Sequence, residues 1–150
     1  MMLLSSVIKH NRPGIYTRLF ILRIAVVIAC LNHSIVQASD LDQCKELTAK
    51  SFDACSRLAG LANTDGLVGL AFLYAEGVGV EKNQVESYKL MLKAAMLGEP
   101  EAQFLVGISL VYGRGVEVNY ERAYAWFLIA TENGNKAARD GIDYLNQKEL

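Results

Sequence analysis

The chain has 150 residues, of which 52% are hydrophobic and 21% charged. It is therefore too apolar for a disordered chain and too charged for a protein with several membrane spans. Residues 1–38 carry four of the 15 basic side chains and none of the 16 acidic ones, so the rest of the chain has a net charge of −5. An acidic chain without a basic stripe argues against nucleic-acid binding. Both histidines, His10 and His33, also lie in residues 1–38, which excludes histidine-based catalytic triads and histidine-ligated metals from the remainder.

The first 38 residues have the pattern of a secretory signal peptide. A basic segment is followed by the apolar run Leu19–Leu31, which is interrupted only by Arg23. This run is shorter than the roughly 20 apolar residues that a membrane-spanning helix needs. Val36 and Ala38 are slender or small, and they stand three and one before the cut that a signal peptidase would make. The pattern predicts cleavage after Ala38 and export of the remainder.

Two alternatives for this segment stay open. Val27-Ile28-Ala29-Cys30 resembles a lipobox, in which Cys30 would become the lipidated first residue of the mature protein. An uncleaved segment would instead act as a membrane anchor. All three interpretations place the rest of the chain outside the cytoplasm, either periplasmic or secreted, or tethered to a membrane and facing outward.

The exported part keeps two cysteines, Cys44 and Cys55. In an oxidising compartment an even number favours a disulfide. Eleven residues of unbroken helix would separate the two Cα atoms by about 16 Å, whereas a disulfide needs Cα atoms within about 7 Å. The bridge therefore requires a turn between the two cysteines, and Thr48–Ser51 is the candidate for that turn. The alternative is one helix with two buried thiols, and no thiol catalysis is expected because no base lies nearby in the sequence. That helix would present one apolar face, formed by Leu41, Cys44, Leu47, Phe52, Cys55 and Leu58.

The rest of the chain repeats itself after a shift of 36 residues, with nine identities and no gap. A period of this length is typical of stacked helical units. The identical positions are Gly77 and Gly113, Gly79 and Gly115, Val80 and Val116, Glu81 and Glu117, Asn83 and Asn119, Tyr88 and Tyr124, Leu92 and Leu128, Ala94 and Ala130, and Gly98 and Gly134.

Each unit is predicted to be a pair of helices. The first helices cover about 65–75 and 100–111. Pro100 lies in the first turn of its helix, where the backbone N–H that proline lacks is not needed for a helical hydrogen bond. They end at the glycine pairs, because glycine permits the left-handed backbone that stops a helix. The second helices cover about 84–97 and 120–133 and are closed by Gly98 and Gly134. We expect Val80 and Val116 to fill the gap between the helices of a unit.

Asparagines mark the starts of the second helices. Asn83 and Asn119 stand where an N-cap is needed, and the spacing of Asn83 to Glu86 resembles a capping box. The apolar stripe of these helices is predicted to be core rather than a cofactor site. Ala94 and Ala130 are small, so neighbouring helices can approach closely. The stripe consists of Tyr88, Leu92 and Ala95, repeated by Tyr124, Leu128 and Thr131.

The two ends of the repeat are predicted to be caps. Ser51–Ala62 matches the second helix of a degenerate unit, so Asp40–Lys50 is interpreted as an N-terminal cap. Asn135 is the candidate cap of a last helix, whose inner face would be Ala138, Ile142 and Leu145. Its outer face is polar, as terminal repeats require. The predicted divisions are 1–38, a signal peptide or anchor; 39–63, N-terminal capping helices; 64–99 and 100–135, two repeats; and 136–150, a C-terminal capping helix.

These residues resemble the Sel1-like repeat family, relatives of the tetratricopeptide repeats. The second copy is the better match. In the first copy Ala71 replaces the usual helix glycine, and in the two copies Asn83 and Asn119 replace the usual aspartate. The matching residues of the second copy are Ala102-Gln103-Phe104-Leu105-Val106-Gly107, Tyr112-Gly113-Arg114-Gly115-Val116, Asn119-Tyr120-Glu121-Arg122-Ala123, Trp126-Phe127, Ala130 and Gly134.

The resemblance implies an all-α fold, a short right-handed solenoid with capping helices that follows the N-terminal signal helix. It also implies an exported adaptor without enzymatic activity, cofactor or metal, which binds a peptide or protein on its concave face. A membrane-tethered assembly subunit is one alternative, and homo-assembly is compatible with either. A secreted hydrolase of the cysteine-rich repeat type is less favoured, because this chain lacks a cysteine pair in each repeat. The best carboxylate pairs for an enzyme would be Glu99 with Glu101 and Asp140 with Asp143.

Overall fold

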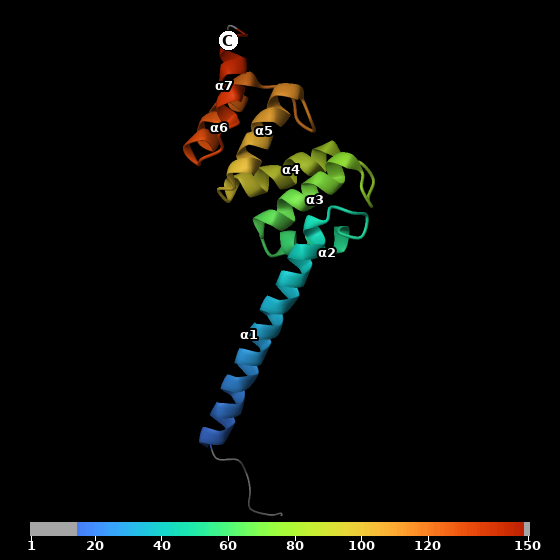
Figure 1. Ribbon diagram of the computed structural model, residues 1–150, viewed down its shortest axis with the longest axis vertical. Helices are drawn as coiled ribbons and strands as arrows, with labels where there is room; N and C mark the ends of the chain where they lie inside the picture. The colour runs from blue at the N-terminus through green and yellow to red at the C-terminus, as the bar shows by residue number, and fades with distance from the viewer. Residues whose placement is uncertain (1–14, 149–150) are drawn as a thin grey trace, which may run out of the picture. The chain divides into compact units, whose positions relative to one another are not determined.

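The computed structural model describes the backbone of residues 15–148 and the side chains of residues 24–28 and 34–148. All the elements in this range are α-helices (Figure 1). The chain divides into two units, residues 1–37 and residues 38–150, which are described separately.

The first unit contains most of helix α1, which runs from Ile15 to Lys45. Several of its apolar side chains are exposed, among them Ile24, Val27 and Ile35. Within the described part of the chain, no helix combines the length and apolarity that crossing a membrane requires. Much of the basic start of the predicted signal segment and the side chain of Cys30 lie outside the described residues. Cleavage after Ala38 therefore stays a prediction.

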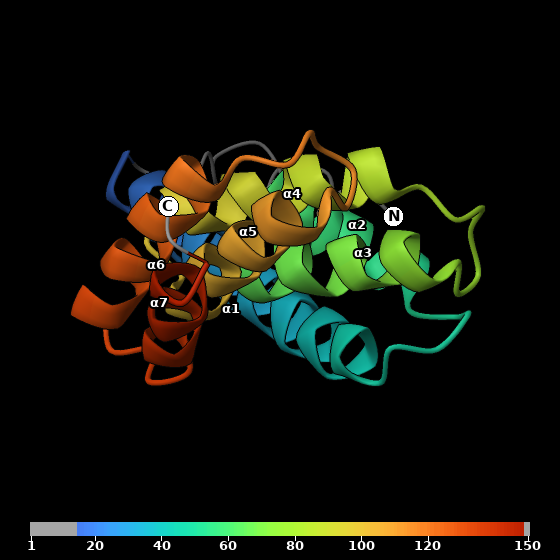
Figure 2. The ribbon, with the colours of Figure 1, turned by 90° about the horizontal axis from the view of Figure 1, so that it is seen from above.

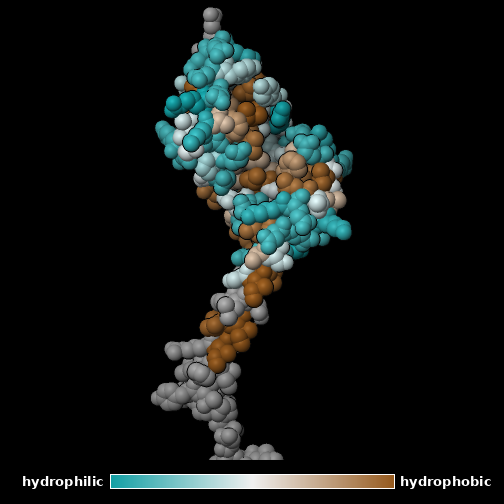
Figure 3. Space-filling model, viewed as in Figure 1, coloured by the Kyte–Doolittle hydropathy of each residue, from teal (hydrophilic) through white to brown (hydrophobic). Residues whose placement is uncertain are grey.

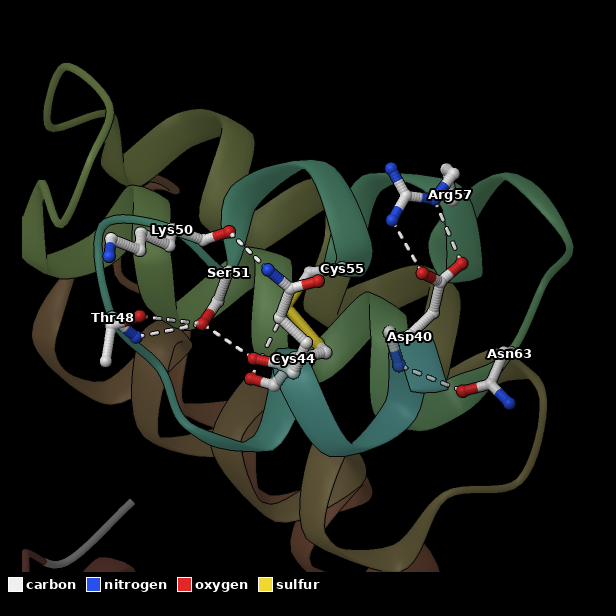
Figure 4. Close-up of a disulfide and its surroundings, with 10 residues drawn as sticks. Asp40, Cys44, Thr48, Lys50, Ser51, Cys55, Arg57 and Asn63 are labelled. Carbon is white, nitrogen blue, oxygen red and sulfur yellow. Dashed lines mark hydrogen bonds and ion pairs between the residues drawn. A yellow bond between two sulfur atoms is a disulfide. The ribbon is translucent and has the colours of Figure 1, made fainter. Parts of the chain in front are cut away.

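The second unit begins with the last residues of α1, a turn and helix α2 (Phe52–Gly60). Residues 40–45 belong to α1 rather than to a separate cap, and the chain reverses between Lys45 and Phe52. Leu47 at φ 48° takes part in the reversal, so the expected turn forms and the single-helix alternative is wrong. The reversal brings the Cα atoms of Cys44 and Cys55 to 4.9 Å, and the two residues form the expected disulfide (Figure 4).

Polar contacts hold this reversal on both sides of the disulfide. The buried hydroxyl of Ser51 donates a hydrogen bond of 2.7 Å to the Gln43 carbonyl and accepts one of 3.0 Å from the Thr48 amide. On the other side, the Arg57 guanidinium donates two hydrogen bonds to the Asp40 carboxylate (Figure 4). The end of α1 is therefore fixed to α2 by covalent, neutral and ionic contacts together.

The four repeat helices lie within one or two residues of their predicted bounds. They are α3 (Thr64–Glu76), α4 (Gln84–Met96), α5 (Pro100–Tyr112) and α6 (Tyr120–Glu132). Gly77 and Gly113 end α3 and α5 with φ of 74° and 68°, values that glycine adopts without strain. Consecutive helices from α2 to α7 pack against one another, and Figure 2 shows α3 to α7 following one another in chain order.

Asn83 and Asn119 cap α4 and α6 as expected. The Asn83 side chain accepts a hydrogen bond of 3.0 Å from the Glu86 amide, and that of Asn119 accepts one of 2.8 Å from Arg122. The second half of the predicted capping box is wrong. The Asn83 amide already donates to the Tyr74 carbonyl at 2.8 Å, and the Glu86 carboxylate pairs with Lys89 instead.

Helix α7 (Ala138–Asn146) follows α6 and packs against both α6 and α5. Its N-cap is Ala137, and the expected contact of Asn135 forms one turn earlier, where its side-chain oxygen accepts a hydrogen bond of 3.1 Å from the Ala138 amide. The core of this end is Phe127, which is 1% exposed. Its ring lies over Gly107 of α5 and Gly141 of α7, where an added Cβ would come within 2.5 and 2.8 Å of the ring. The missing side chains of these glycines therefore make room for the ring.

The predicted core stripe is wrong for the second repeat. Tyr88 is buried, 9% exposed, whereas the equivalent Tyr124 is 36% exposed and Leu128 is 42% exposed. The cause is the difference between the covering helices. The nine-residue α7 covers less of α6 than the thirteen-residue α5 covers of α4.

Candidate protein-binding face

Helices α3 and α5 carry apolar side chains on more than the face that is buried in the core. Leu67, Leu70 and Leu73 of α3 are buried, yet Phe72 on another side of the same helix is 41% exposed. In α5, Tyr112 is 57% exposed beside the buried Leu110. A helix with a second apolar face has surface left for another element or another molecule.

Phe72 borders a recess of about 450 Å³ between α3, α4 and α5, here called the central recess. Its volume lies within the range of ligand-binding pockets. Figure 3 shows apolar surface over α5 and in the hollow between α5 and α3. The central recess is lined by Val68, Phe72, Ala75, Glu76, Lys82, Gln84, Ser87, Tyr88, Met91, Leu105, Ile108, Ser109 and Arg114.

A second recess of about 280 Å³, the distal recess, lies between α5, α6 and α7. Its lining repeats that of the central recess after the same shift of 36 residues. Ile108 lines both, so the two recesses adjoin. The equivalent pairs are Val68 and Phe104, Phe72 and Ile108, Ala75 and Val111, Glu76 and Tyr112, Met91 and Phe127, Leu105 and Gly141, and Ile108 and Tyr144.

A third recess of about 290 Å³, the proximal recess, lies beside the disulfide. It shares Val68 with the central recess and is acidic, since three carboxylates and one ammonium group line it. Its lining residues are Cys44, Lys45, Leu47, Asp65, Val68, Gly69, Glu99 and Glu101.

The polar groups beneath these recesses link neighbouring helices. The buried Gln103 side chain donates to the Ala95 carbonyl at 3.2 Å and accepts from Asn133 at 2.9 Å, which joins the ends of α4 and α6 to α5. The Tyr88 hydroxyl is the one buried side-chain polar atom without a hydrogen-bond partner among the described residues. The two hydrogen bonds of Gln103 therefore hold α4, α5 and α6 in fixed positions relative to one another, and a binding surface requires such support.

Most of the repeat positions predicted from the sequence lie in turns and helix contacts rather than in the recesses. Val80 and Val116 are half-buried against the core, and Ala94 and Ala130 are fully buried. Tyr88 is the exception, because it lines the central recess. Trp126 packs against the core without lining any of these three recesses.

Of the two predicted carboxylate pairs, Glu99 and Glu101 line the proximal recess together, whereas Asp140 and Asp143 do not share a recess. Glu99 is half-buried and Glu101 is exposed in the proximal recess, where Glu101 accepts a hydrogen bond of 2.9 Å from Asn135. Asp140 and Asp143 are exposed on α7, and Asp140 alone of the pair lines the distal recess. In the described part of the chain, no group of three metal-ligating side chains comes together.

Apart from Tyr88, Phe104, Leu105 and Phe127, most residues that line the central and distal recesses are not marked by the repeat pattern. The signal was present, because the 36-residue shift also aligns the apolar residues Val68 with Phe104 and Phe72 with Ile108. These pairs share apolar character rather than identity, so they are less evident in the sequence than the nine identical pairs.

Comparison with known proteins agrees with the helical repeat. The family model of the Sel1 repeat matches residues 53–99 and 100–135. The first segment spans α2 to α4 and the second spans α5 and α6. Chitin synthase regulator SKT5 of Saccharomyces cerevisiae is 35% identical over 74 residues, which are 48% of this chain and 11% of the yeast protein. The chain therefore spans about a tenth of that relative's length.

Three solved structures share the fold. Cysteine rich protein B of Helicobacter pylori has a TM-score of 0.59 and 25% identity, over 61% of this chain and 68% of that one. A protective antigen of uropathogenic Escherichia coli with an SLR fold has a TM-score of 0.64 and 28% identity, over 67% of this chain and 22% of that one. A Sel1 repeat protein from Oxalobacter formigenes has a TM-score of 0.60 and 29% identity, over 63% of this chain and 38% of that one. Since the two segments that match the family model cover more than half of the residues, this chain belongs to the Sel1 repeat family.

Proposed function

We propose that this protein is an exported adaptor without enzymatic activity, and that its central and distal recesses bind a segment of a partner protein. Sel1 repeat proteins are generally protein-interaction scaffolds and are typically non-enzymatic. The two predicted repeats, 64–99 and 100–135, would supply most of the binding face, and the C-terminal cap would complete it with α7.

One observation carries this proposal: apolar residues that are exposed, or half-buried against the core as Ile108 is, recur at equivalent positions of successive units. Phe72, Ile108 and Tyr144 are 36 residues apart, and each of them lines a recess. Phe72 is 41% exposed and Tyr144 is 39% exposed. Apolar surface that repeats with the fold and stays accessible is the kind of surface that binds a partner.

Export is supported by two features of the N-terminal part. The basic and apolar pattern of residues 1–38 is that of a signal peptide. The disulfide between Cys44 and Cys55 favours an oxidising compartment, because cytosolic proteins rarely keep disulfides. Retention of the segment as an anchor, or lipidation of Cys30, would give a tethered adaptor with the same binding face.

The test is capture of partners by the tagged full chain in the cells that produce it, with chemical cross-linking and mass spectrometry. Phe72→Ser with Ile108→Ser should lose a partner that the wild type captures, because both substitutions remove apolar surface from the recesses. Leu61→Ser with Met96→Ser is the matched control, since these side chains are 53% and 76% exposed and line none of the three recesses. An identical set of partners for all three proteins would contradict the proposal.

A further inference from the structure

Two cations border the central recess. Lys82 follows the glycine turn after α3, and Arg114 lies within the glycine turn after α5. Both line the recess whose apolar part includes Phe72 and Ile108. Stacking of the repeats therefore brings two positive side chains from separate turns to one apolar hollow.

Neither cation is neutralised by an ion pair in the described part of the chain. The salt bridges there are Asp40–Arg57 and Glu86–Lys89. The Arg114 guanidinium lies 5.3 Å from the centre of the Tyr112 ring, a contact that positions it and leaves its charge unpaired. Glu76 also lines the recess, so the net charge of the side chains that line it is +1. This positive charge lies in a chain whose residues after position 38 have a net charge of −5.

The neighbouring proximal recess has the opposite sign. Asp65, Glu99 and Glu101 outnumber Lys45 there, which leaves a net charge of −2. The two recesses meet at Val68. An anionic group on a bound segment would be repelled from the proximal recess and attracted toward Lys82 and Arg114.

We propose that the central recess recognises an apolar side chain next to a carboxylate, with the apolar side chain against Phe72 and Ile108 and the carboxylate beside Lys82 and Arg114. This inference rests on the proposed function and names the chemistry of the segment that is bound. A glutamate or aspartate side chain and a free C-terminal carboxylate present the same chemistry, and the test separates them.

The test measures binding of fluorescein-labelled eight-residue peptides to the full chain by fluorescence anisotropy. One peptide has a central Leu-Phe pair followed by glutamate and an amidated end. A second has the pair at a free C-terminal carboxylate, and a third has lysine in place of the glutamate and an amidated end. We expect at least one carboxylate peptide to bind about five- to tenfold more tightly than the lysine peptide. Whichever one does so identifies the source of the carboxylate.

Charge reversal in the protein checks the assignment to these two side chains. Lys82→Glu with Arg114→Glu should reverse the preference, so that the lysine peptide binds more tightly than the carboxylate peptides. Arg122→Glu with Lys136→Glu makes the same change in net charge at exposed positions that line none of the described recesses. This control should keep the wild-type preference, and circular dichroism should show the same helix content for all three proteins.

The outcomes separate this inference from the function on which it rests. Equal binding of all peptides that is lost in Phe72→Ser with Ile108→Ser would leave the adaptor proposal standing and overturn the carboxylate preference. A preference that survives Lys82→Glu with Arg114→Glu would also overturn it. No binding of any peptide would overturn the carboxylate preference, whereas binding that is unaffected by either pair of substitutions would overturn both.

Discussion

Gly69 of α3 lies directly against the disulfide. An added Cβ would be 2.6 Å from the Cys44 sulfur, closer than real Cβ contacts allow, and 3.0 Å from the Cys55 sulfur, a tight contact. Both sulfurs belong to buried residues, 2% and 0% exposed, so they have little room to move. Glycine at this position therefore lets α3 approach the bridged ends of α1 and α2.

We expect Gly69→Ala to lower the free energy of unfolding by up to about 2 kcal/mol. The overpacking costs about 1–3 kcal/mol, and the better helix propensity of alanine offsets about 1 kcal/mol of it. In a Cys44→Ala, Cys55→Ala background the same substitution should be neutral or stabilising, because the sulfurs are gone. Urea unfolding of the four proteins gives the coupling. Gly60→Ala is the control, since nothing lies within 4 Å of its added Cβ. Equal effects of Gly69→Ala in both backgrounds would contradict the account.

The ion pair between Asp40 and Arg57 predicts a defined dependence of stability on pH. The hydrogen bonds from Arg57 hold the pKa of the Asp40 carboxyl below its ordinary value of 3.8. Near and below that value the unfolded state binds a proton that the folded state does not, so stability falls as the pH falls. The stabilisation is complete at neutral pH.

Asp40→Asn should lower the melting temperature at neutral pH and flatten its decline as the pH falls through 3.8. Asp143→Asn, on the exposed side of α7, controls for the loss of one negative charge. Differential scanning calorimetry across the acid range makes the comparison. An acid decline in Asp40→Asn as steep as that of the wild type would show that the ion pair does not contribute to it.

At the scale of single residues, the sequence predicts what depends on local backbone chemistry. Asn83, Asn119 and Pro100 have the expected roles because a cap or a first-turn proline acts within one turn of helix. The role of Gly69 could not be predicted, because its need for space comes from a disulfide that is formed by distant residues. The Glu86 half of the capping box failed for the same reason, since Tyr74 takes the Asn83 amide.

At the scale of elements, the glycine turns do more than end helices. Gly115 lies against the start of α4, where an added Cβ would be 2.0 Å from the Gln84 carbonyl oxygen. The turn of one repeat therefore packs on the second helix of the repeat before it. Gly134 has a similar positive φ of 97°, but nothing lies within 4 Å of its added Cβ.

Gly115→Ala should therefore destabilise the protein more than Gly134→Ala. Both substitutions place alanine in a left-handed backbone conformation, which costs about 1–2 kcal/mol of stability. Gly115→Ala also creates a clash with the backbone of α4, which costs about 1–3 kcal/mol more. Chemical denaturation of the two variants measures the difference. Equal losses would show that the turn does not pack on α4 as described.

The sequence predicts α3 to α6 well because each has its own start and stop residues. It does less well at the ends of the repeat. Residues 40–45 continue α1, since no helix-stopping residue separates them from the preceding apolar run. The exposure of Tyr124 and Leu128 also could not be predicted, because the spacing of a stripe does not say how much of it the next helix covers.

At the scale of the whole molecule, the proposed binding face arises from stacking of the repeats. Phe72, Ile108 and Tyr144 lie far apart in sequence, and the 36-residue repeat places them at equivalent points of successive units. The sequence predicts that repeat, but the split between core and recess follows from how the helices pack. The charge of the central recess likewise depends on two separate turns meeting at one hollow.

The proposed export, with cleavage of the signal peptide, predicts which residue begins the mature protein. Mass spectrometry of the protein from the producing cells should show Ser39 as the first residue, because the signal peptide pattern ends at Ala38. The mature chain would keep Asp40, Cys44 and their partners. A mature protein that begins with a lipidated Cys30, or one that still begins with Met1, would indicate a membrane-tethered adaptor instead of a free exported one.

Binding of a partner protein in the recesses can be measured by site-specific photo-cross-linking. A photoreactive phenylalanine analogue is placed at Phe72, Ile108 or Tyr144, and at Leu61 or Met96 as controls, in the full chain in the producing cells. The account predicts one and the same partner cross-linked from the three recess positions and from neither control. The same cross-links from recess and control positions alike, or none from the recesses, would contradict it.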